Sequence, residues 1–141
     1  MEEVFLKKFF HRYPHVLEEI PSFTQIYDKD ELIAEKFNST VAEKSFIQHS
    51  EILAIQEANS IKTYFENATL LTTLEPCIMC AGAIIKSRIQ TVIYFVEATK
   101  YEGISSLQPE FIYNLNFFPK IIYNKNAKIQ EIFKSFFLAK R

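Results

Sequence analysis

Two short motifs of this chain contain residue types that can bind a metal and move a proton. Cys77 and Cys80, the only cysteines, lie in Pro-Cys-Ile-Met-Cys, and His49 and Glu51 lie upstream in His-Ser-Glu. Two thiolates and one imidazole are ligands that zinc prefers, and three protein ligands leave the fourth tetrahedral position open for water. The spacing therefore predicts a hydrolytic site with one Zn²⁺ per chain, held by His49, Cys77 and Cys80, and with Glu51 as the catalytic carboxylate.

Glu51 stands two residues from the histidine, so its carboxylate can reach a water on the metal without being a ligand itself. Zinc would lower the pKa of that water to about 7. The combination of H-x-E with P-C-x-x-C is typical of zinc deaminases of nucleobases, in which the glutamate takes the proton and delivers it to the ring nitrogen and the departing amine. We therefore expect Glu51 to carry the proton of a deamination.

Each motif has a simpler interpretation when it is taken alone. A Cys-x-x-Cys pair can be a redox pair or two buried small side chains, and Glu51 can be a first-turn carboxylate that stabilises a helix dipole. Because both motifs occur together, the metal site is the favoured interpretation. His11 and His15 are four residues apart, but Pro14 between them distorts a helix, so we predict surface or packing residues there.

Length and composition predict a single deaminase domain over 1–141. The chain is 48% hydrophobic, with 14 Phe and 7 Tyr against 2 Gly, which indicates a substantial core and extra apolar surface suited to a subunit interface. Two cysteines at metal-ligand spacing fit a reducing cytosol rather than a disulfide framework. No signal peptide is recognisable, and no segment approaches the roughly 18 apolar residues of a membrane span, so we expect a cytoplasmic protein without a membrane partner.

The C-terminal segment differs from the rest of the chain in charge. Residues 1–75 carry 7 Lys+Arg and 13 Asp+Glu, residues 76–115 carry 3 of each, and residues 116–141 carry 6 and 1. This basic end either guides an anionic substrate or is the solvated face of a helix. Its aromatic residues at helical spacing form either part of the core or a platform for stacking bases; these are Phe133, Phe136 and Phe137.

Hydrophobic periodicity and turn signals predict alternating strands and helices, and therefore an α/β layered domain. Pro76 suits the entry to a helix, and Cys77 and Cys80 then share one face of its first turn. His49 and Glu51 begin the preceding helix, so two helix starts are expected to converge on one metal. The predicted helices are 3–19, weakened by Pro14, and 50–61, 77–87 and 127–140; the predicted strands are 24–27, 31–37, 68–74, 91–96 and 119–123, and 38–48 is a loop.

The run Thr73–Ile89, Thr-Leu-Glu-Pro-Cys-Ile-Met-Cys-Ala-Gly-Ala-Ile-Ile-Lys-Ser-Arg-Ile, resembles the bacterial tRNA-specific adenosine deaminases. The similarity extends to Glu19–Pro21, to Asn38 eleven residues before His49, and to the ending Phe136–Arg141. The resemblance implies a three-layer α/β/α cytidine deaminase-like fold with a central five-stranded mixed sheet, and a homodimer. It also implies hydrolytic conversion of adenosine to inosine at the wobble position, with the tRNA anticodon loop as partner.

The same resemblance assigns the zinc ligands and the proton carrier to the four residues named above. It further implies a base-contacting amide at Asn38, and places Leu74 and Glu75 beside the open coordination position. Lys100 lies in the loop that meets RNA in that family, and Phe137 in its C-terminal helix. We predict these five residues to bind the substrate.

This chain departs from the family pattern in four segments. Ser50 stands where Ala is usual, and Ser22–Gln25 replaces a Val-Gly-Ala-Val-like strand. The loop Phe95–Glu102 keeps Lys100 but lacks the usual Gly, and Ser39–Gln48 is also replaced. Two other functions therefore stay open. One is deamination of a free base or nucleoside such as guanine or cytosine, and the other is a non-catalytic, zinc-stabilised partner subunit, against which the retained Glu51 argues.

Overall fold

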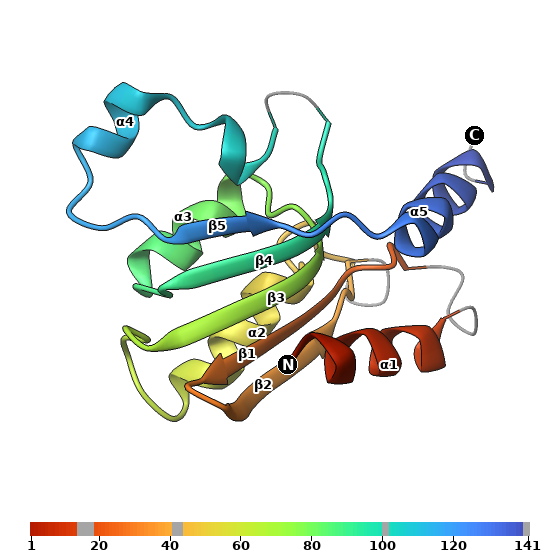
Figure 1. Cartoon of the computed structure of the whole chain (residues 1–141), viewed down its shortest axis with the longest axis horizontal. Helices are drawn as coiled ribbons and strands as arrows, with labels where there is room; N and C mark the ends of the chain where they lie inside the picture. The colour runs from red at the N-terminus through yellow and green to blue at the C-terminus, as the bar shows by residue number, and fades with distance from the viewer. Residues whose placement is uncertain (14–18, 41–43, 100–101, 140–141) are drawn as a thin grey trace.

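A five-stranded mixed sheet forms the centre of the computed structural model, which describes residues 1–13, 19–40, 44–99 and 102–139 (Figure 1). The strand order is β2-β1-β3-β4-β5, with β2, β1 and β3 antiparallel and β3, β4 and β5 parallel. The predicted mixed sheet is thus confirmed. The strands are β1 (Phe23–Asp28), β2 (Glu31–Phe37), β3 (Ala68–Leu74), β4 (Thr91–Val96) and β5 (Lys120–Tyr123).

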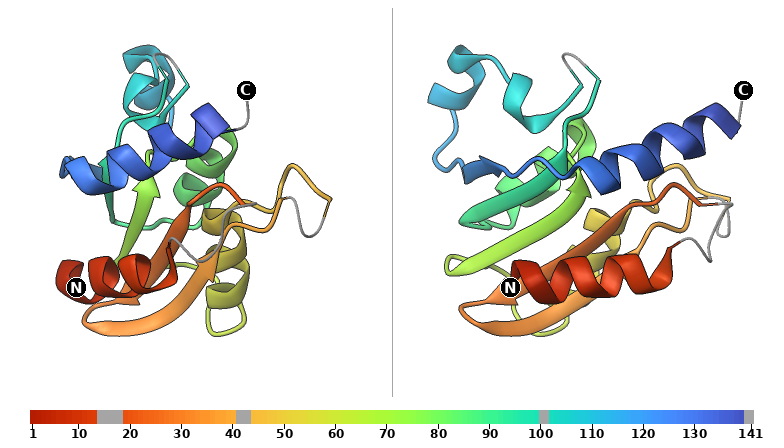
Figure 2. Two further views of the ribbon diagram at one scale, coloured as in Figure 1. Left: turned by 90° about the vertical axis from the view of Figure 1, so that its right-hand side faces the viewer. Right: turned by 45° about the vertical axis from the view of Figure 1, so that its right-hand side comes forward.

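Helices cover both faces of this sheet, which gives the three layers that were predicted (Figures 1 and 2). α2 and α3 lie on one face, and α1 and α5 lie on the other. Successive side chains of a strand point to opposite faces, so Leu70 packs in the first core while Leu71 packs in the second. The helices are α1 (Glu2–Arg12), α2 (Ser50–Asn59), α3 (Ile78–Lys86), α4 (Pro109–Tyr113) and α5 (Ala127–Ala139), and η1 (Ile104–Ser106) is a 3₁₀ turn.

Much of the phenylalanine content lies in the core between α1 and the sheet. Phe5 of α1 stacks on Phe23 and Phe95 with ring centroids 4.9 and 5.2 Å apart, and Phe23 stacks on Phe37 at 4.3 Å. Phe23, one of the departures from the family pattern, therefore fills this core. Its neighbours Ser22 and Thr24 face the other side of the sheet, where α2 packs.

The first helix is shorter than predicted. It ends at Arg12 instead of continuing to residue 19, and Tyr13 is extended with φ −94° and ψ 137°. The physical reason is Pro14, since the residue before a proline is excluded from the helical region. Residues 14–18, including Pro14 and His15, lie outside the described ranges.

The other predicted elements are confirmed to within a few residues, but η1 and α4 were not predicted. α4 has only five residues and begins with Pro109, so it is too short to show a helical period. The helix predicted over 77–87 begins at Ile78, and Cys77 is its N-cap. Within the described ranges, no helix has the length and apolar character needed to span a bilayer.

Candidate metal centre and active site

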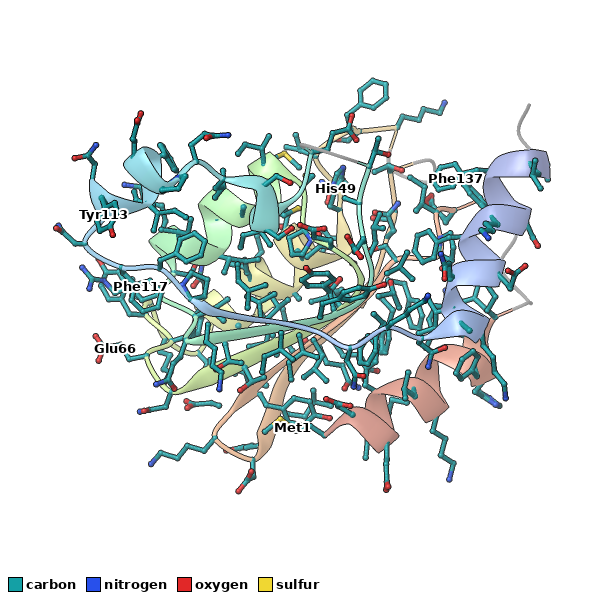
Figure 3. All side chains as sticks on the ribbon, turned by 45° about the horizontal axis from the view of Figure 1, so that its top comes forward. Met1, His49, Glu66, Tyr113, Phe117 and Phe137 are labelled. Atoms are coloured by element: carbon teal, nitrogen blue, oxygen red, sulfur yellow. The ribbon has the colours of Figure 1, made fainter. Side chains whose placement is uncertain are left out.

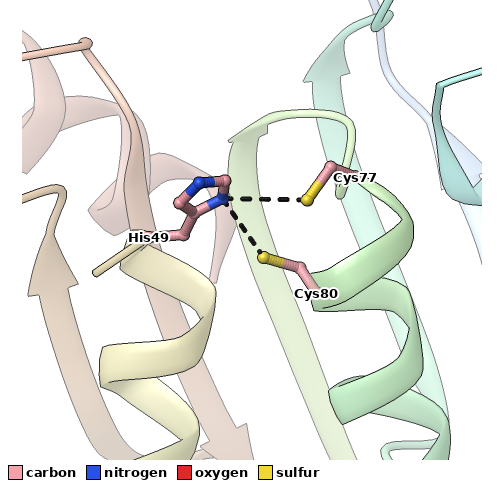
Figure 4. A group of neighbouring side chains, drawn as sticks. All are labelled: His49, Cys77 and Cys80. Carbon is pink, nitrogen blue, oxygen red and sulfur yellow. Dashed lines mark hydrogen bonds between the residues drawn. The ribbon is translucent and has the colours of Figure 1, made fainter. Parts of the chain in front are cut away.

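Two helix starts meet at one point of the molecule, as was predicted. His49 is the N-cap of α2 and Cys77 is the N-cap of α3, with Cys80 in the first turn of α3. Figure 4 shows the imidazole of His49 turned towards both cysteines. Its Nδ1 lies 3.7 Å from the Sγ of Cys77 and 3.5 Å from the Sγ of Cys80, and the three ligand atoms all lie within 4.8 Å of one another.

This arrangement fits a tetrahedral zinc ion. Zn–N and Zn–S bonds of ordinary length at tetrahedral angles place the nitrogen and sulfur about 3.6 Å apart. The two observed distances of 3.5 and 3.7 Å lie on either side of that value. Cys80 is fully buried whereas His49 and Cys77 are half-buried, so the group is open on one side. Two sulfurs and one nitrogen are the donor set of zinc sites that keep an open position.

Hydrogen bonds among the three side chains favour a thiolate at Cys77. The hydrogen bond with Cys80 and, next, that with His49 lower the pKa of Cys77 to about 3, against the effect of burial. The same hydrogen bond with Cys77, together with burial, raises the pKa of Cys80. The hydrogen bond with Cys77 also raises the pKa of His49. A deprotonated sulfur is the form that coordinates a metal, and one shared hydrogen bond favours the thiolate at only one of the two cysteines. A bound metal would deprotonate the other as well.

Glu51 is buried beside this group, with 4% of its surface exposed, and it is not one of the three clustered ligands. Its Oε1 accepts a hydrogen bond of 2.8 Å from the hydroxyl of Ser50. The hydroxyls of Ser22, Thr24 and Thr72 lie 3.3, 3.3 and 3.4 Å from the same oxygen. Sequence reasoning missed these three partners. The available signal was a polar residue at alternate positions of buried strands, because a buried hydroxyl needs a partner.

Asn38, predicted to contact the base, lies at the end of β2 and is 6% exposed. Its amide nitrogen donates to Oε2 of Glu19 at 3.3 Å and to the hydroxyl of Thr40 at 3.1 Å. The next residue, Ser39, donates its backbone N–H to the carbonyl of Gln48 at 3.1 Å. The chain directly after Asn38 is therefore paired with the segment that leads into His49.

A cavity of about 720 Å³ opens beside Cys77, at the carboxyl ends of the parallel strands β3 and β4. Leu74, Glu75 and Phe137, three of the predicted substrate-binding residues, line it together with Cys77. Figure 3 shows Phe137 projecting from α5, and Phe137 is 48% exposed. Lys100 lies outside the described ranges, as do Lys140 and Arg141. The remaining lining residues are Val96, Glu97, Ala98, Thr99, Glu102, Gln130, Phe133, Lys134 and Leu138.

The aromatic residues of α5 are divided between the core and the cavity. Phe133 is 4% exposed and belongs to the core against α1 and the sheet, yet it also lines the cavity. Phe137 packs against Phe133 with ring centroids 6.4 Å apart and leaves about half of its surface exposed at the cavity. The core interpretation is thus confirmed for Phe133, and Phe137 stays available to a ligand.

The carboxylate of Glu75 is bound by the loop that follows β4. Oε1 accepts the backbone N–H of Ala98 at 3.1 Å, and Oε2 accepts the backbone N–H and the hydroxyl of Ser105 at 2.8 and 2.6 Å. The backbone of Gly103 passes directly over this carboxylate and pairs with Cys77. Glu75 therefore fixes Ala98, which lines the cavity, and Ser105 next to a predicted metal ligand.

Gly103→Ala is expected to lower the free energy of unfolding by about 1–3 kcal/mol, because its Cβ would overlap the Glu75 carboxylate and displace it from these donors. Urea unfolding measures the change. Gly82→Ala is the matched control, since a Cβ there meets nothing within 4 Å and Gly82 lies inside α3. The control should gain up to about 1 kcal/mol from helix propensity. Equal stability of Gly103→Ala and the parent protein would contradict the close approach.

Comparison with known proteins agrees with this site. The tRNA-specific adenosine deaminases of Aquifex aeolicus (strain VF5) and Bacillus subtilis (strain 168) are 40% and 41% identical to this chain over 91 and 78 residues. These stretches are 63% and 54% of this chain but 60% and 48% of the relatives, so the chain spans about half to three fifths of the length of the relatives it matches. The resemblance to the bacterial tRNA-specific adenosine deaminases, which the motifs indicated, is thus confirmed.

Solved structures show the same fold. A structure from a study of A-to-I editing by tRNA:A34 deaminases has a TM-score of 0.76 and 24% identity, covering 94% of this chain and 96% of that one. A guanine deaminase from Nitrosomonas europaea has a TM-score of 0.70 and 16% identity, covering 95% and 79%. The family described as the cytidine and deoxycytidylate deaminase zinc-binding region matches residues 23–96, which include His49, Glu51, Cys77 and Cys80. The chain belongs to this family of zinc-binding deaminases.

Proposed function

We propose that this protein converts adenosine to inosine at the wobble position of a tRNA anticodon, by zinc-dependent hydrolysis. The proposal rests on the ligand atoms of His49, Cys77 and Cys80, which lie within 4.8 Å of one another, with the buried carboxylate of Glu51 beside them. The identity of 38–41% to proteins named tRNA-specific adenosine deaminases supports the choice of substrate.

The chemistry exchanges the amine of adenine for the oxygen of water and releases ammonia. Zinc held by His49, Cys77 and Cys80 supplies a Lewis acid that makes water acidic enough to be a nucleophile near neutral pH. Glu51 takes the first proton of the water and passes it to the ring nitrogen as the oxygen adds to the ring carbon. It then takes the second proton from the added hydroxyl and passes it to the amine, which leaves as ammonia when the carbon–nitrogen bond breaks. Because Glu51 is buried next to the ligands, its carboxylate can make both transfers without leaving the site.

The five substrate-binding residues predicted from the resemblance remain part of this proposal. Leu74 and Phe137 add apolar surface to the cavity beside Cys77, which suits the flat face of a base. Glu75 acts through Ala98 and Ser105, which its carboxylate holds. Asn38 offers the oxygen of its carboxamide, since both protons of its amide nitrogen are used by Glu19 and Thr40. Lys100 is assigned to the phosphate backbone of the anticodon loop.

We also propose a cytoplasmic homodimer. Three large apolar side chains near the metal ligands in sequence are strongly exposed: Phe46 at 93%, Ile47 at 56% and Ile78 at 62%. Ile78 directly follows Cys77 at the start of α3. Apolar side chains exposed to this extent are typical of surfaces that meet a partner.

A deaminase of free bases is the second candidate, and the charge of the cavity favours it. Among the described residues that line the cavity, three are acidic, Glu75, Glu97 and Glu102, and one is basic, Lys134. Such a lining suits a neutral base with amino groups better than a polyanion. The fold similarity to a guanine deaminase is compatible with this alternative.

One assay separates the two candidates. The zinc-loaded protein is incubated with a tRNA transcript that bears adenosine at the wobble position, and separately with guanine, cytosine and adenosine. We expect inosine in the transcript and no ammonia from the small molecules. Ammonia from guanine or cytosine with an unchanged transcript would transfer the assignment to free bases. The same transcript with guanosine at the wobble position, and the Glu51→Gln protein, are the controls.

A further inference from the structure

Four buried hydroxyls, which we call the hydroxyl cluster, surround one oxygen of Glu51. They are Ser22, Thr24, Ser50 and Thr72, from the chain entering β1, from β1, from the start of α2 and from β3. Thr24, Ser50 and Thr72 are fully buried, and Ser22 is 6% exposed. In the described part of the chain, every hydroxyl hydrogen bond to this carboxylate ends on Oε1.

Ser50 is the centre of this cluster. Its Oγ lies 2.7 Å from the hydroxyls of Ser22 and Thr24, and 2.8 Å from Oε1 of Glu51. The hydroxyl of Thr24 also lies 3.0 Å from that of Thr72, where the register of β1 and β3 places the two threonines opposite each other. The cluster therefore joins both central strands to the first turn of α2.

The four hydroxyls of the cluster have four protons to donate, and their arrangement determines how the cluster acts on the carboxylate. Each hydroxyl has one proton to donate and two lone pairs to accept. If Ser50 and Thr72 donate to Oε1, then Ser22 and Thr24 can both donate to Ser50, whose two lone pairs accept them. Oε1 then receives two donors, of which Ser50 is polarised by the two hydroxyls behind it, and such chains strengthen their members. Every proton of the cluster is then used.

We propose that the hydroxyl cluster positions Glu51 by dedicating Oε1 to the protein, so that Oε2 is the oxygen that takes and releases the proton. This inference rests on the proposed role of Glu51 as proton carrier. The four hydroxyls are positioning residues, because they act on the reaction through Glu51. A carboxylate with one oxygen held in this way keeps a single orientation during the proton transfers, which general acid–base catalysis requires.

The test compares the double variant Thr24→Val/Ser50→Ala with two single variants. The double variant keeps the volume nearly constant and removes the centre of the cluster. Thr24→Ser keeps the hydroxyl and is the conservative variant. Thr73→Val is the matched control, because the buried hydroxyl of Thr73 bonds the backbone of Pro21 and Phe23 at 3.1 Å and does not contact Glu51.

Crystal structures, zinc content, and kcat and KM for inosine formation are measured for each protein. We expect the double variant to keep its zinc and to show the Glu51 carboxylate displaced or in several conformers. Its kcat should fall at least about tenfold while KM stays within about twofold, because orientation and not binding is lost. Thr24→Ser and Thr73→Val should keep kcat within about twofold of the parent protein.

An unmoved Glu51 carboxylate in the double variant overturns the inference, whatever the rate. Loss of zinc from the double variant overturns it as well, since the cluster would then support the metal ligands and not Glu51. If the parent protein forms no inosine, the proposed function fails. The position of Glu51 in the double variant then still decides the inference, because that readout needs no substrate.

Discussion

Replacing Glu51 by glutamine is expected to lower kcat for inosine formation by about 10²–10⁴-fold, the range that a positioned general acid–base contributes. Glutamine has the size of glutamate and still accepts the hydrogen bond that Ser50 donates at 2.8 Å, so the fold and the zinc should be retained. What it loses is the ability to take a proton. Single-turnover inosine formation, zinc analysis and thermal unfolding, carried out together, separate a chemical defect from a structural one.

The matched control for this substitution is Glu57→Gln on the same helix. Glu57 lies on the surface and forms an ion pair of 2.8 Å with Lys36. Its replacement should leave kcat within about twofold of the parent protein. If Glu51→Gln retained activity within about tenfold of the parent protein, Glu51 would not be the proton carrier, since that loss is below the range of general acid–base catalysis.

Cys80→Ala is expected to lose the zinc ion and with it the activity. Cys80 is fully buried in the first turn of α3, and its sulfur is one of three ligand atoms within 4.8 Å of one another. With one thiolate gone, two protein ligands remain, too few for the three-ligand catalytic site. Metal analysis of the purified proteins should give one zinc per parent chain and almost none for the variant.

Chelation provides a second readout of the same site. Removing zinc from the parent protein should lower its Tm, because the metal binds the folded chain, whereas the Tm of Cys80→Ala should not respond. Met79→Ala, between the two cysteines, is the control that should keep its zinc. Stoichiometric zinc in Cys80→Ala together with normal turnover would remove the site assignment.

These experiments also decide between the candidate functions. A protein that binds zinc and turns over neither tRNA nor free bases would be a partner subunit, which the sequence left open. The buried carboxylate of Glu51 argues against that outcome, because burying a charge requires hydrogen-bond partners, and here four hydroxyls around Oε1 offer them. A chain without catalysis would gain little from a carboxylate held in this way beside the metal ligands.

The sequence by itself determined the metal centre and most of the fold. Cys77 and Cys80 are three residues apart at a helix start, and this local spacing brings their sulfurs together. Strands β3, β4 and β5 could be predicted as short, mainly apolar runs, and β1 and β2 as two runs joined by the polar turn Asp28-Lys29-Asp30. The early end of α1 also has a local cause, because Pro14 disfavours a helical backbone at Tyr13. The prediction of a helix over 3–19 gave this effect too little weight.

Only the tertiary structure decided what surrounds Glu51 and Glu75. The hydroxyls of Ser22, Thr24 and Thr72 come from 21 to 29 residues before or after Glu51, and they meet at one oxygen because α2 packs on the face of β1 and β3. Glu75 was predicted to touch substrate, yet its carboxylate is held by Ala98 and Ser105. Hydrogen bonds of this kind depend on the register of strands and the path of loops, which a local pattern of residues does not specify.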